Sequence, residues 1–206
     1  MNIVLIGAPL AGKGTQATLL QQNLGLKHIS TGELLREEMK KDTELGKTVK
    51  DYMEKGNLVP DNITIEVLKE RLSKSDTKNG VLLDGFPRTL YQAKQLDNII
   101  NIDKVVFINV SLENLLKRIA GRYVCSDCKK TNTISEKVTP CIYCGGKLTK
   151  RSDDTEETVQ KRYATFVKET LPIVEYYKAQ NKVIEVIGNT TVEEIYSEIE
   201  GRLKND

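Results

Sequence analysis

The segment that most constrains how this chain can fold is a glycine-rich loop at residues 7–15, Gly-Ala-Pro-Leu-Ala-Gly-Lys-Gly-Thr, directly after the apolar residues 3–6. This order predicts a buried strand, a tight loop and a helix that begins near Lys13. Backbone N–H groups and the helix dipole at such a junction attract a phosphate, and Lys13 adds a positive charge. The alternative is a turn that only joins strand to helix, but such a turn rarely needs glycine on both sides of a lysine.

The rest of the chain alternates short apolar runs with longer amphipathic stretches, which predicts an α/β fold. The expected strands are residues 3–6, 27–29, 81–83, 105–110 and 183–186. The fourth run is wholly apolar, as expected for a strand buried on both faces of a parallel sheet. Helices are expected from residue 13, from 30 to about 41, over 44–54, from 61 to about 73, over 89–99 and 112–120, and after residues 154 and 191.

Several polar residues stand where helix caps are expected. Ser30 with Glu33, Asp154 with Glu157, and Thr191 with Glu194 fit capping boxes, and Asp61 fits a single cap. The long helix after residue 154 is expected to bend at Pro172.

Composition limits the class of protein. With 206 residues, 39% hydrophobic and 29% charged, the chain is long enough for one compact globular domain with insertions. The formal net charge of +2 does not demand nucleic acid or an anionic membrane as a partner. No apolar run approaches the length of a membrane span, and the first residues lack the basic leader of a signal peptide, so we expect a cytoplasmic protein.

All four cysteines lie in a polar stretch, residues 121–154, as two Cys-x-x-Cys pairs: Cys125 with Cys128, and Cys141 with Cys144. Each pair can supply two thiolates to a tetrahedral ion, and four protein ligands make a closed, structural site. Zinc is the default ion, with iron as a competitor. Disulfides are the main alternative, but they are rare in a reducing compartment. The polar stretch lacks apolar residues for a core of its own, and a metal would replace that core.

Four motifs appear in order along the chain. The phosphate loop departs from the pattern G-x-x-x-x-G-K-[ST], because Gly14 stands where the hydroxyl is expected and Thr15 follows one place later. The others are Ser-Thr-Gly-Glu at 30–33, Leu-Val-Pro-Asp at 58–61, and Asp-Gly-Phe-Pro-Arg at 84–88 with Gln92. Together they resemble the nucleoside monophosphate kinase family over essentially the whole chain, and within it the adenylate kinases of the bacterial, long-lid, zinc-bearing type.

The resemblance implies the reversible reaction ATP + AMP = 2 ADP with Mg²⁺, and a structural Zn²⁺ in the lid. It implies a phosphate-loop, five-stranded parallel sheet flanked by helices, forming a core of residues 1–29, 60–120 and 155–206. A helical AMP-binding insert would span residues 30–59, and a zinc-bearing, β-rich lid would span residues 121–154. We expect ATP and AMP or ADP to be the binding partners of a monomer, without nucleic acid or membrane.

Residue roles are carried over from the same resemblance. The resemblance assigns catalysis to six charged residues: Lys13, Asp84, Arg88, Arg122, Arg151 and Arg162. ATP binding falls to the loop, the lid and one residue near the C-terminus: Leu10, Ala11, Gly12, Lys13, Gly14, Thr15, Arg122, Thr131, Asn132 and Asn189. AMP binding falls to Thr31, Arg36, Asn57, Leu58, Val59, Gly85, Phe86, Pro87, Arg88, Gln92, Arg151 and Arg162. The four cysteines bind the metal.

Within the catalytic set, Asp84 is expected to steer Mg²⁺ and its waters. Its alternative is a turn cap before Gly85. Outside the motifs, we interpret Arg71, Arg118 and Arg202 as ordinary helix-face charges. The lone His28 is interpreted as a structural histidine with satisfied hydrogen bonds.

Leu10 is the main departure from the family, which has glycine there. If the position requires a positive φ, leucine costs on the order of 1–2 kcal/mol. Asn57 also replaces an expected acidic residue, which a backbone contact tolerates.

Two rival functions remain open. A UMP/CMP kinase belongs to the same family, but such relatives usually have a short lid without cysteines. A zinc-ribbon nucleic-acid-binding protein belongs to another class, and the small net charge and the few aromatic residues near the cysteines disfavour it.

Overall fold

A computed structural model describes residues 1–133, 140–150 and 154–205. Its centre is a sheet of five parallel strands in the order β2-β3-β1-β4-β8. Ile3 of β1 lies beside Leu82 of β3 and Lys104 of β4, so the strand before the phosphate loop is the middle of the sheet. The predicted α/β fold is confirmed. The strands of this sheet are β1 (Ile3–Gly7), β2 (Lys27–Ser30), β3 (Val81–Asp84), β4 (Lys104–Asn109) and β8 (Val183–Ile187).

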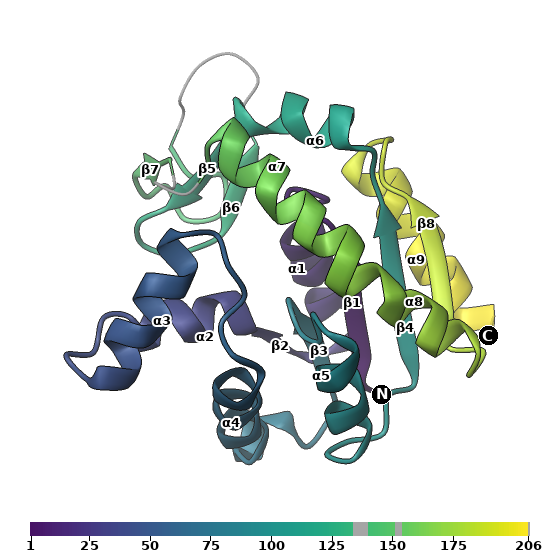
Figure 1. Ribbon diagram of the computed structural model, residues 1–206. Coiled ribbons are helices and arrows are strands. Elements are labelled where there is room, and N and C mark those ends of the chain that lie inside the picture. The colour runs from purple at the N-terminus through teal and green to yellow at the C-terminus, as the bar shows by residue number, and fades with distance from the viewer. Residues whose placement is uncertain (134–139, 151–153, 206) are drawn as a thin grey trace.

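Helices cover both faces of the sheet, as Figure 1 shows. α1 and α9 pack together on one face, while α5 and α8 pack together on the other. The helices are α1 (Lys13–Leu24), α2 (Thr31–Glu38), α3 (Glu44–Glu54), α4 (Asp61–Leu72), α5 (Leu90–Asp97), α6 (Leu112–Ile119), α7 (Glu156–Thr165), α8 (Leu171–Lys178) and α9 (Val192–Asn205), with a short 3₁₀ turn η1 (Ser75–Thr77).

The core lies between these layers. All five residues of β1 are buried, and so are the four central residues of β4. Both strands read as continuous apolar runs because helices cover them on both sides. Parallel strands end at one edge of the sheet, and the loops that follow β1 and β3 therefore lie next to each other there.

A second, smaller sheet stands apart from the core, with the antiparallel order β6-β5-β7. Its strands are β5 (Arg122–Cys125), β6 (Thr131–Thr133) and β7 (Leu148–Thr149). Among its described residues, the buried apolar cluster consists of Cys125, Cys141 and Leu148, so this part of the chain has little hydrophobic core.

A long helical rod made of α7, η2 and α8 lies in front of the sheet in Figure 1. Between α7 and α8 the rod has a π-helical segment, η2 (Phe166–Thr170), which ends two residues before Pro172. Pro172 lies in the first turn of α8. The Thr170 hydroxyl donates a hydrogen bond of 2.8 Å to the Arg88 carbonyl. This hydrogen bond links the end of η2 to the loop that follows β3.

One predicted capping box is confirmed, and three other predicted caps are wrong. The Thr191 and Glu194 side chains each accept a bond from the other residue's N–H, at 3.3 and 3.0 Å. Ser30 precedes α2, but its side chain accepts no capping bond. Thr155, not Asp154, caps α7.

Asp61 is likewise not a cap, because it is the first residue of α4 and follows Pro60. Its carboxylate instead bonds to α5, and Asp154 bonds to Arg122, so tertiary contacts replace both local caps.

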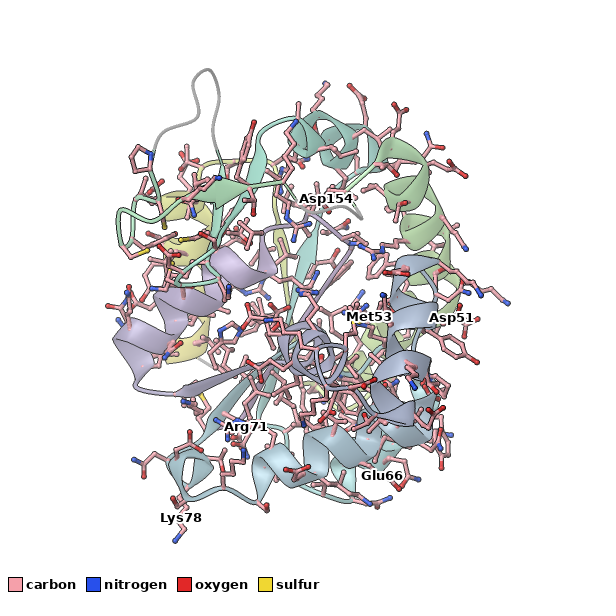
Figure 2. The ribbon with its side chains drawn as sticks, turned by 90° about the vertical axis from the view of Figure 1, so that its left-hand side faces the viewer. Asp51, Met53, Glu66, Arg71, Lys78 and Asp154 are labelled. Atoms are coloured by element: carbon pink, nitrogen blue, oxygen red, sulfur yellow. The ribbon has the colours of Figure 1, made fainter. Side chains whose placement is uncertain are left out.

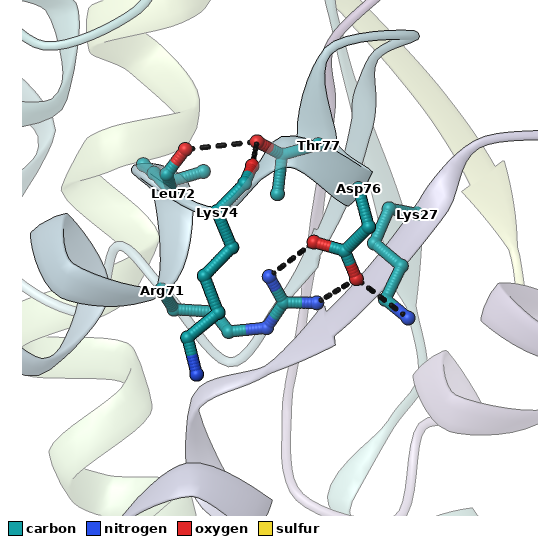
Figure 3. Close-up of polar contacts among 6 residues, drawn as sticks. All are labelled: Lys27, Arg71, Leu72, Lys74, Asp76 and Thr77. Atoms are coloured by element: carbon teal, nitrogen blue, oxygen red, sulfur yellow. Dashed lines mark hydrogen bonds and ion pairs between the residues drawn. The ribbon is translucent and has the colours of Figure 1, made fainter.

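A clasp of three charged side chains joins the end of α4 to the start of β2 (Figure 3). Arg71 donates two hydrogen bonds of 2.8 Å to Asp76, and Lys27 lies 3.0 Å from the same carboxylate. Hydrogen bonds from Arg71 and then from Lys27 hold the pKa of Asp76 well below its usual value. Arg71 is therefore not an ordinary helix-face charge.

No helix within residues 1–133, 140–150 and 154–205 combines the length and apolarity needed to cross a membrane.

Candidate active site

The phosphate loop joins β1 to α1 at the carboxyl edge of the sheet. Its backbone is left-handed at Leu10, with φ of 68°, and at Gly12, with φ of 94°. Lys13 begins the helix, and its amine donates hydrogen bonds of 2.9 Å to the carbonyls of Gly7 and Ala8. The amine is thereby held across the mouth of the loop.

The electrostatic environment of Lys13 makes its charge sensitive to pH. Burial lowers its pKa to about 8; Asp84 opposes this shift, while Arg88 and Arg122 add to it. An anion bound in the loop would counter the neighbouring positive charges and favour the protonated amine.

Asp84 ends β3 and faces the phosphate loop. A Cβ atom at Gly14 would lie only 3.7 Å from its Oδ2, so the carboxylate approaches the loop backbone. Burial alone would raise the pKa of Asp84, but His28 and Lys13 outweigh it and lower the pKa below its usual value. The group is therefore an ionised carboxylate at neutral pH.

His28 is not the satisfied structural residue that the sequence suggested. Its Nε2 lies 3.8 Å from Asp84 Oδ2, which is too long for a hydrogen bond. This buried nitrogen has no hydrogen-bond partner among the residues that the structure describes.

The loop after β3 is shaped by Gly85, with φ of 84°. A side chain here would lie 3.0 Å from both Thr31 Oγ1 and Arg88 Nη2. Thr31 donates a hydrogen bond of 3.1 Å to the Asp84 carbonyl, and Arg88 Nε donates one of 2.7 Å to the Gly85 carbonyl. These bonds set the direction of the Arg88 guanidinium.

A single cavity of about 570 Å³ connects these parts. Most of the predicted nucleotide-binding residues line it: Leu10, Ala11, Gly12, Lys13, Gly14, Thr15, Arg36, Asn57, Leu58, Val59, Asp84, Gly85, Pro87, Arg88, Gln92, Arg122, Thr131 and Arg162. They come from segments far apart in the sequence, which the fold brings to one edge of the sheet.

Four predicted nucleotide-binding residues among those that the structure describes do not line the cavity, and a fifth cannot be placed. Arg151 lies outside the described residues. Phe86 is buried in the core, and Thr31 is buried against Gly85. Asn189 is exposed in the turn after β8, next to Thr190, which does line the cavity.

Asn132 is the fourth described residue that does not line the cavity, and its side chain points into the cysteine cluster. It donates to Cys141 Sγ at 3.5 Å and to the Lys130 carbonyl at 3.1 Å, and it accepts from Ile142 N at 3.1 Å. The side chain is therefore directed at the two cysteine turns.

The arginines reach the cavity from different elements. Arg122, at the start of β5, forms an ion pair of 3.0 Å with Asp154, which is labelled in Figure 2. Arg162 on α7 donates to the carbonyl of Met53 at 3.5 Å. Both contacts link the cavity rim to neighbouring segments.

Sequence reasoning missed Arg118 on α6. Its guanidinium lines the cavity and donates to the Leu10 carbonyl at 3.1 Å and to the Gly188 carbonyl. The residue is not an ordinary helix-face charge, because it ties the phosphate loop to the turn after β8. No local motif marks it, since its partners are distant in sequence.

The four cysteines form one cluster. Their sulfurs all lie within 4.8 Å of one another, with 3.5 Å between Cys125 and Cys144 and 3.6 Å between Cys128 and Cys141. All four thiols are free, so the disulfide alternative is not supported. Four thiolates about 2.3 Å from one tetrahedral ion lie roughly 3.8 Å apart, which these spacings fit.

A phosphate loop, an ionised carboxylate on the adjacent strand and converging arginines around one cavity define a phosphate-loop phosphotransferase. The family model for adenylate kinase matches residues 5–182. The chain is 46% identical to the adenylate kinase of Caldicellulosiruptor bescii over 97% of both chains. It is 44% identical to that of Alkaliphilus oremlandii over 100% of both, and 45% identical to that of Thermosipho africanus over 97% of both. The chain belongs to the adenylate kinase family, and its reaction is the phosphoryl transfer ATP + AMP = 2 ADP.

Proposed function

We propose that this cavity holds both nucleotides at once, with ATP on the phosphate loop and AMP on the side of Arg88 and Gln92. The single observation that carries the proposal is the continuity of the cavity from Lys13 to Gln92. An acceptor bound between α2, α4 and α5 would present its phosphate to Arg36 and Arg88, and so to the loop.

Transfer itself needs positioning and charge stabilisation more than covalent help. An oxygen of the AMP phosphate attacks the γ-phosphorus of ATP, and the bond from that phosphorus to the leaving ADP oxygen breaks. Lys13 and the loop N–H groups would hold the charge on the donor side. Arg88, Arg122 and Arg162 would hold the transferring group, and Arg151 is proposed to join them.

Mg²⁺ would accompany ATP, as in other adenylate kinases, and would neutralise the charge that develops on the phosphates. Asp84 suits it, because the carboxylate is ionised and directed at Gly14 of the loop. Thr15 supplies a hydroxyl at the first turn of α1. In this proposal Asp84 orients the ion's waters.

We assign a structural Zn²⁺ to the cysteine cluster. Four thiols around one centre leave no open position for catalysis, and N–H groups support the sulfurs: Asp127 N donates to Cys125 Sγ at 3.4 Å. The metal would hold the two cysteine turns together, since the described residues of this unit form only a minimal apolar core.

The proposed division has a core of residues 1–29, 60–120 and 155–206, an AMP-binding insert of 30–59, and a lid of 121–154. The lid would close over ATP and exclude water during transfer, bringing Thr131 to the nucleotide, with Asn132 meeting it through its backbone because its side chain is bonded to the cysteine turns. Asn189 would contact ATP from the turn after β8, and Thr31 and Phe86 would complete the AMP side. We propose a cytoplasmic monomer.

The test is the purified enzyme with ATP, Mg²⁺ and AMP, UMP or CMP in turn, with products separated by ion-exchange chromatography. We expect ADP from AMP, at least about 100-fold faster than transfer to either pyrimidine nucleotide. Lys13→Met is expected to lose at least about 100-fold in kcat. Lys50→Met, at an exposed position on α3, is the matched control and should keep the wild-type rate. Preferred transfer to UMP or CMP would overturn the proposal.

A further inference from the structure

The side chain of Gln92 lines the acceptor side of the cavity yet is only 1% exposed. Two of its hydrogen-bonding positions are already in use. Its Oε1 accepts from Arg88 N at 2.7 Å, and its Nε2 donates to Asp61 Oδ1 at 2.7 Å. One N–H and one lone pair of the carboxamide remain for a ligand.

The two partners fix which end of the carboxamide is oxygen and which is nitrogen. A backbone N–H can only donate, and a carboxylate can only accept. Turning the carboxamide over would set its oxygen against the Asp61 carboxylate and its NH₂ against the Arg88 N–H. Both contacts would then be mismatched in a buried place, where unmatched polar groups are costly.

Asp61 is itself held in place. Its second oxygen accepts a hydrogen bond of 2.9 Å from the Thr89 hydroxyl, and that hydroxyl accepts one of 3.2 Å from Gln92 N. Asp61 does not line the cavity, so a nucleotide would not touch it. It stands behind Gln92 and joins the first turn of α4 to the first turn of α5.

We propose that Asp61 is a specificity-determining positioning residue, which locks the Gln92 carboxamide so that it recognises a 6-aminopurine monophosphate and rejects a 6-oxopurine. This inference rests on the proposed binding of AMP beside Gln92. An aminopurine offers a donor amino group next to a ring acceptor, whereas an oxopurine offers an acceptor oxygen next to a ring donor. A base held in one position therefore pairs with only one orientation of the carboxamide.

Asp61→Asn tests the lock, because it keeps the size of the side chain and removes the obligatory acceptor. An asparagine can turn its own amide to suit either orientation of Gln92, so one of the two mismatches disappears. We expect the ratio of kcat/KM for AMP to kcat/KM for IMP to fall about tenfold, the equivalent of roughly 1.4 kcal/mol. The products ADP and IDP are separated chromatographically.

Asp76→Asn is the matched control. It makes the same chemical change in a carboxylate that is also hydrogen-bonded, but far from the cavity in the clasp with Arg71 (Figure 3). We expect this variant to keep the wild-type ratio. Thr89→Ala should lower the ratio by less than Asp61→Asn, and Thr89→Ser, which keeps the hydroxyl, should restore it. The Thr89 pair keeps the inference testable if Asp61→Asn does not fold.

The outcomes separate the inference from the proposed function. A wild-type enzyme that makes no ADP from AMP overturns the proposed function and the inference with it. An active wild type whose ratio is unchanged in Asp61→Asn, or in both Thr89 variants, overturns the inference alone. A loss of kcat for AMP and IMP alike would show a merely structural role and would also overturn it.

Discussion

Leu10 is strained in the phosphate loop, and removing its side chain should reveal the strain. Its φ of 68° lies in the left-handed region, where a residue with a Cβ atom pays on the order of 1–2 kcal/mol. The hydrogen bond from Arg118 to the Leu10 carbonyl helps to hold this conformation. Leu10→Ala and Leu10→Gly both remove the leucine side chain, but only glycine also removes the Cβ clash.

The difference in unfolding free energy between Leu10→Gly and Leu10→Ala follows from two opposing contributions. Glycine relieves about 1–2 kcal/mol of backbone strain, but it loses about 0.5–1 kcal/mol because its unfolded chain is more flexible. The free energy of unfolding of Leu10→Gly should therefore exceed that of Leu10→Ala by about 0.5–1 kcal/mol. In a chain of this length, such a difference raises Tm by roughly 1–4 °C.

Scanning calorimetry of the two variants without nucleotide measures this difference. Glycine normally destabilises a protein relative to alanine, so the predicted order is the reverse of the usual one. An alanine variant as stable as the glycine variant would refute the reasoning. A comparison of the kinetic constants of Leu10→Gly with those of the wild type gives a second readout, because Leu10 lines the cavity.

We expect Leu10→Gly to have a higher kcat/KM for ATP than the wild type, by up to about fivefold if about 1 kcal/mol of strain bears on binding. Equal kinetic constants for the two proteins would show that the leucine does not affect the site.

Two further predictions concern pH and metal. Because the charged amine of Lys13 binds the phosphates and its pKa in the free enzyme is about 8, kcat/KM for ATP should fall as pH rises through 8. In Lys13→Arg this alkaline decline should disappear, and a wild-type profile that is flat to about pH 9.5 would contradict the assignment. The cysteine cluster should bind one zinc per chain, measurable by atomic absorption. A strong chelator should make the segment around β5–β7 sensitive to protease while the parallel sheet keeps its circular dichroism, and resistance of the metal-free segment would argue against a structural metal.

Much of the fold was predictable from local patterns. The five strands of the parallel sheet were expected within a residue or so of their limits at most ends, because buried strands read as continuous apolar runs between turn residues. The phosphate loop and the paired cysteines were predictable for a similar reason. Each depends on residues close together in sequence, and their spacing alone brings the functional groups together.

Other features depended on contacts that no local pattern shows. Asp61 and Asp154 looked like helix caps, but tertiary partners took their carboxylates. Asn132 stood where the family contacts ATP, yet its side chain turned to the cysteine turns. The direction of a polar side chain is set by whichever partner the packing brings within hydrogen-bond distance, and that partner can be anywhere in the chain.

The sequence by itself determined the fold class, the phosphate loop, the cysteine cluster and the unusual residue at position 10. Only the tertiary structure decided that Leu10 has a left-handed backbone, that Arg118 holds its carbonyl, and that Asp61 lies behind Gln92. The physical reason is the separation in sequence of the residues involved. Strand burial and metal-ligand spacing depend on residues that lie within a few positions of one another. Hydrogen bonds across 31 or 108 positions exist only once the helices have packed around the sheet.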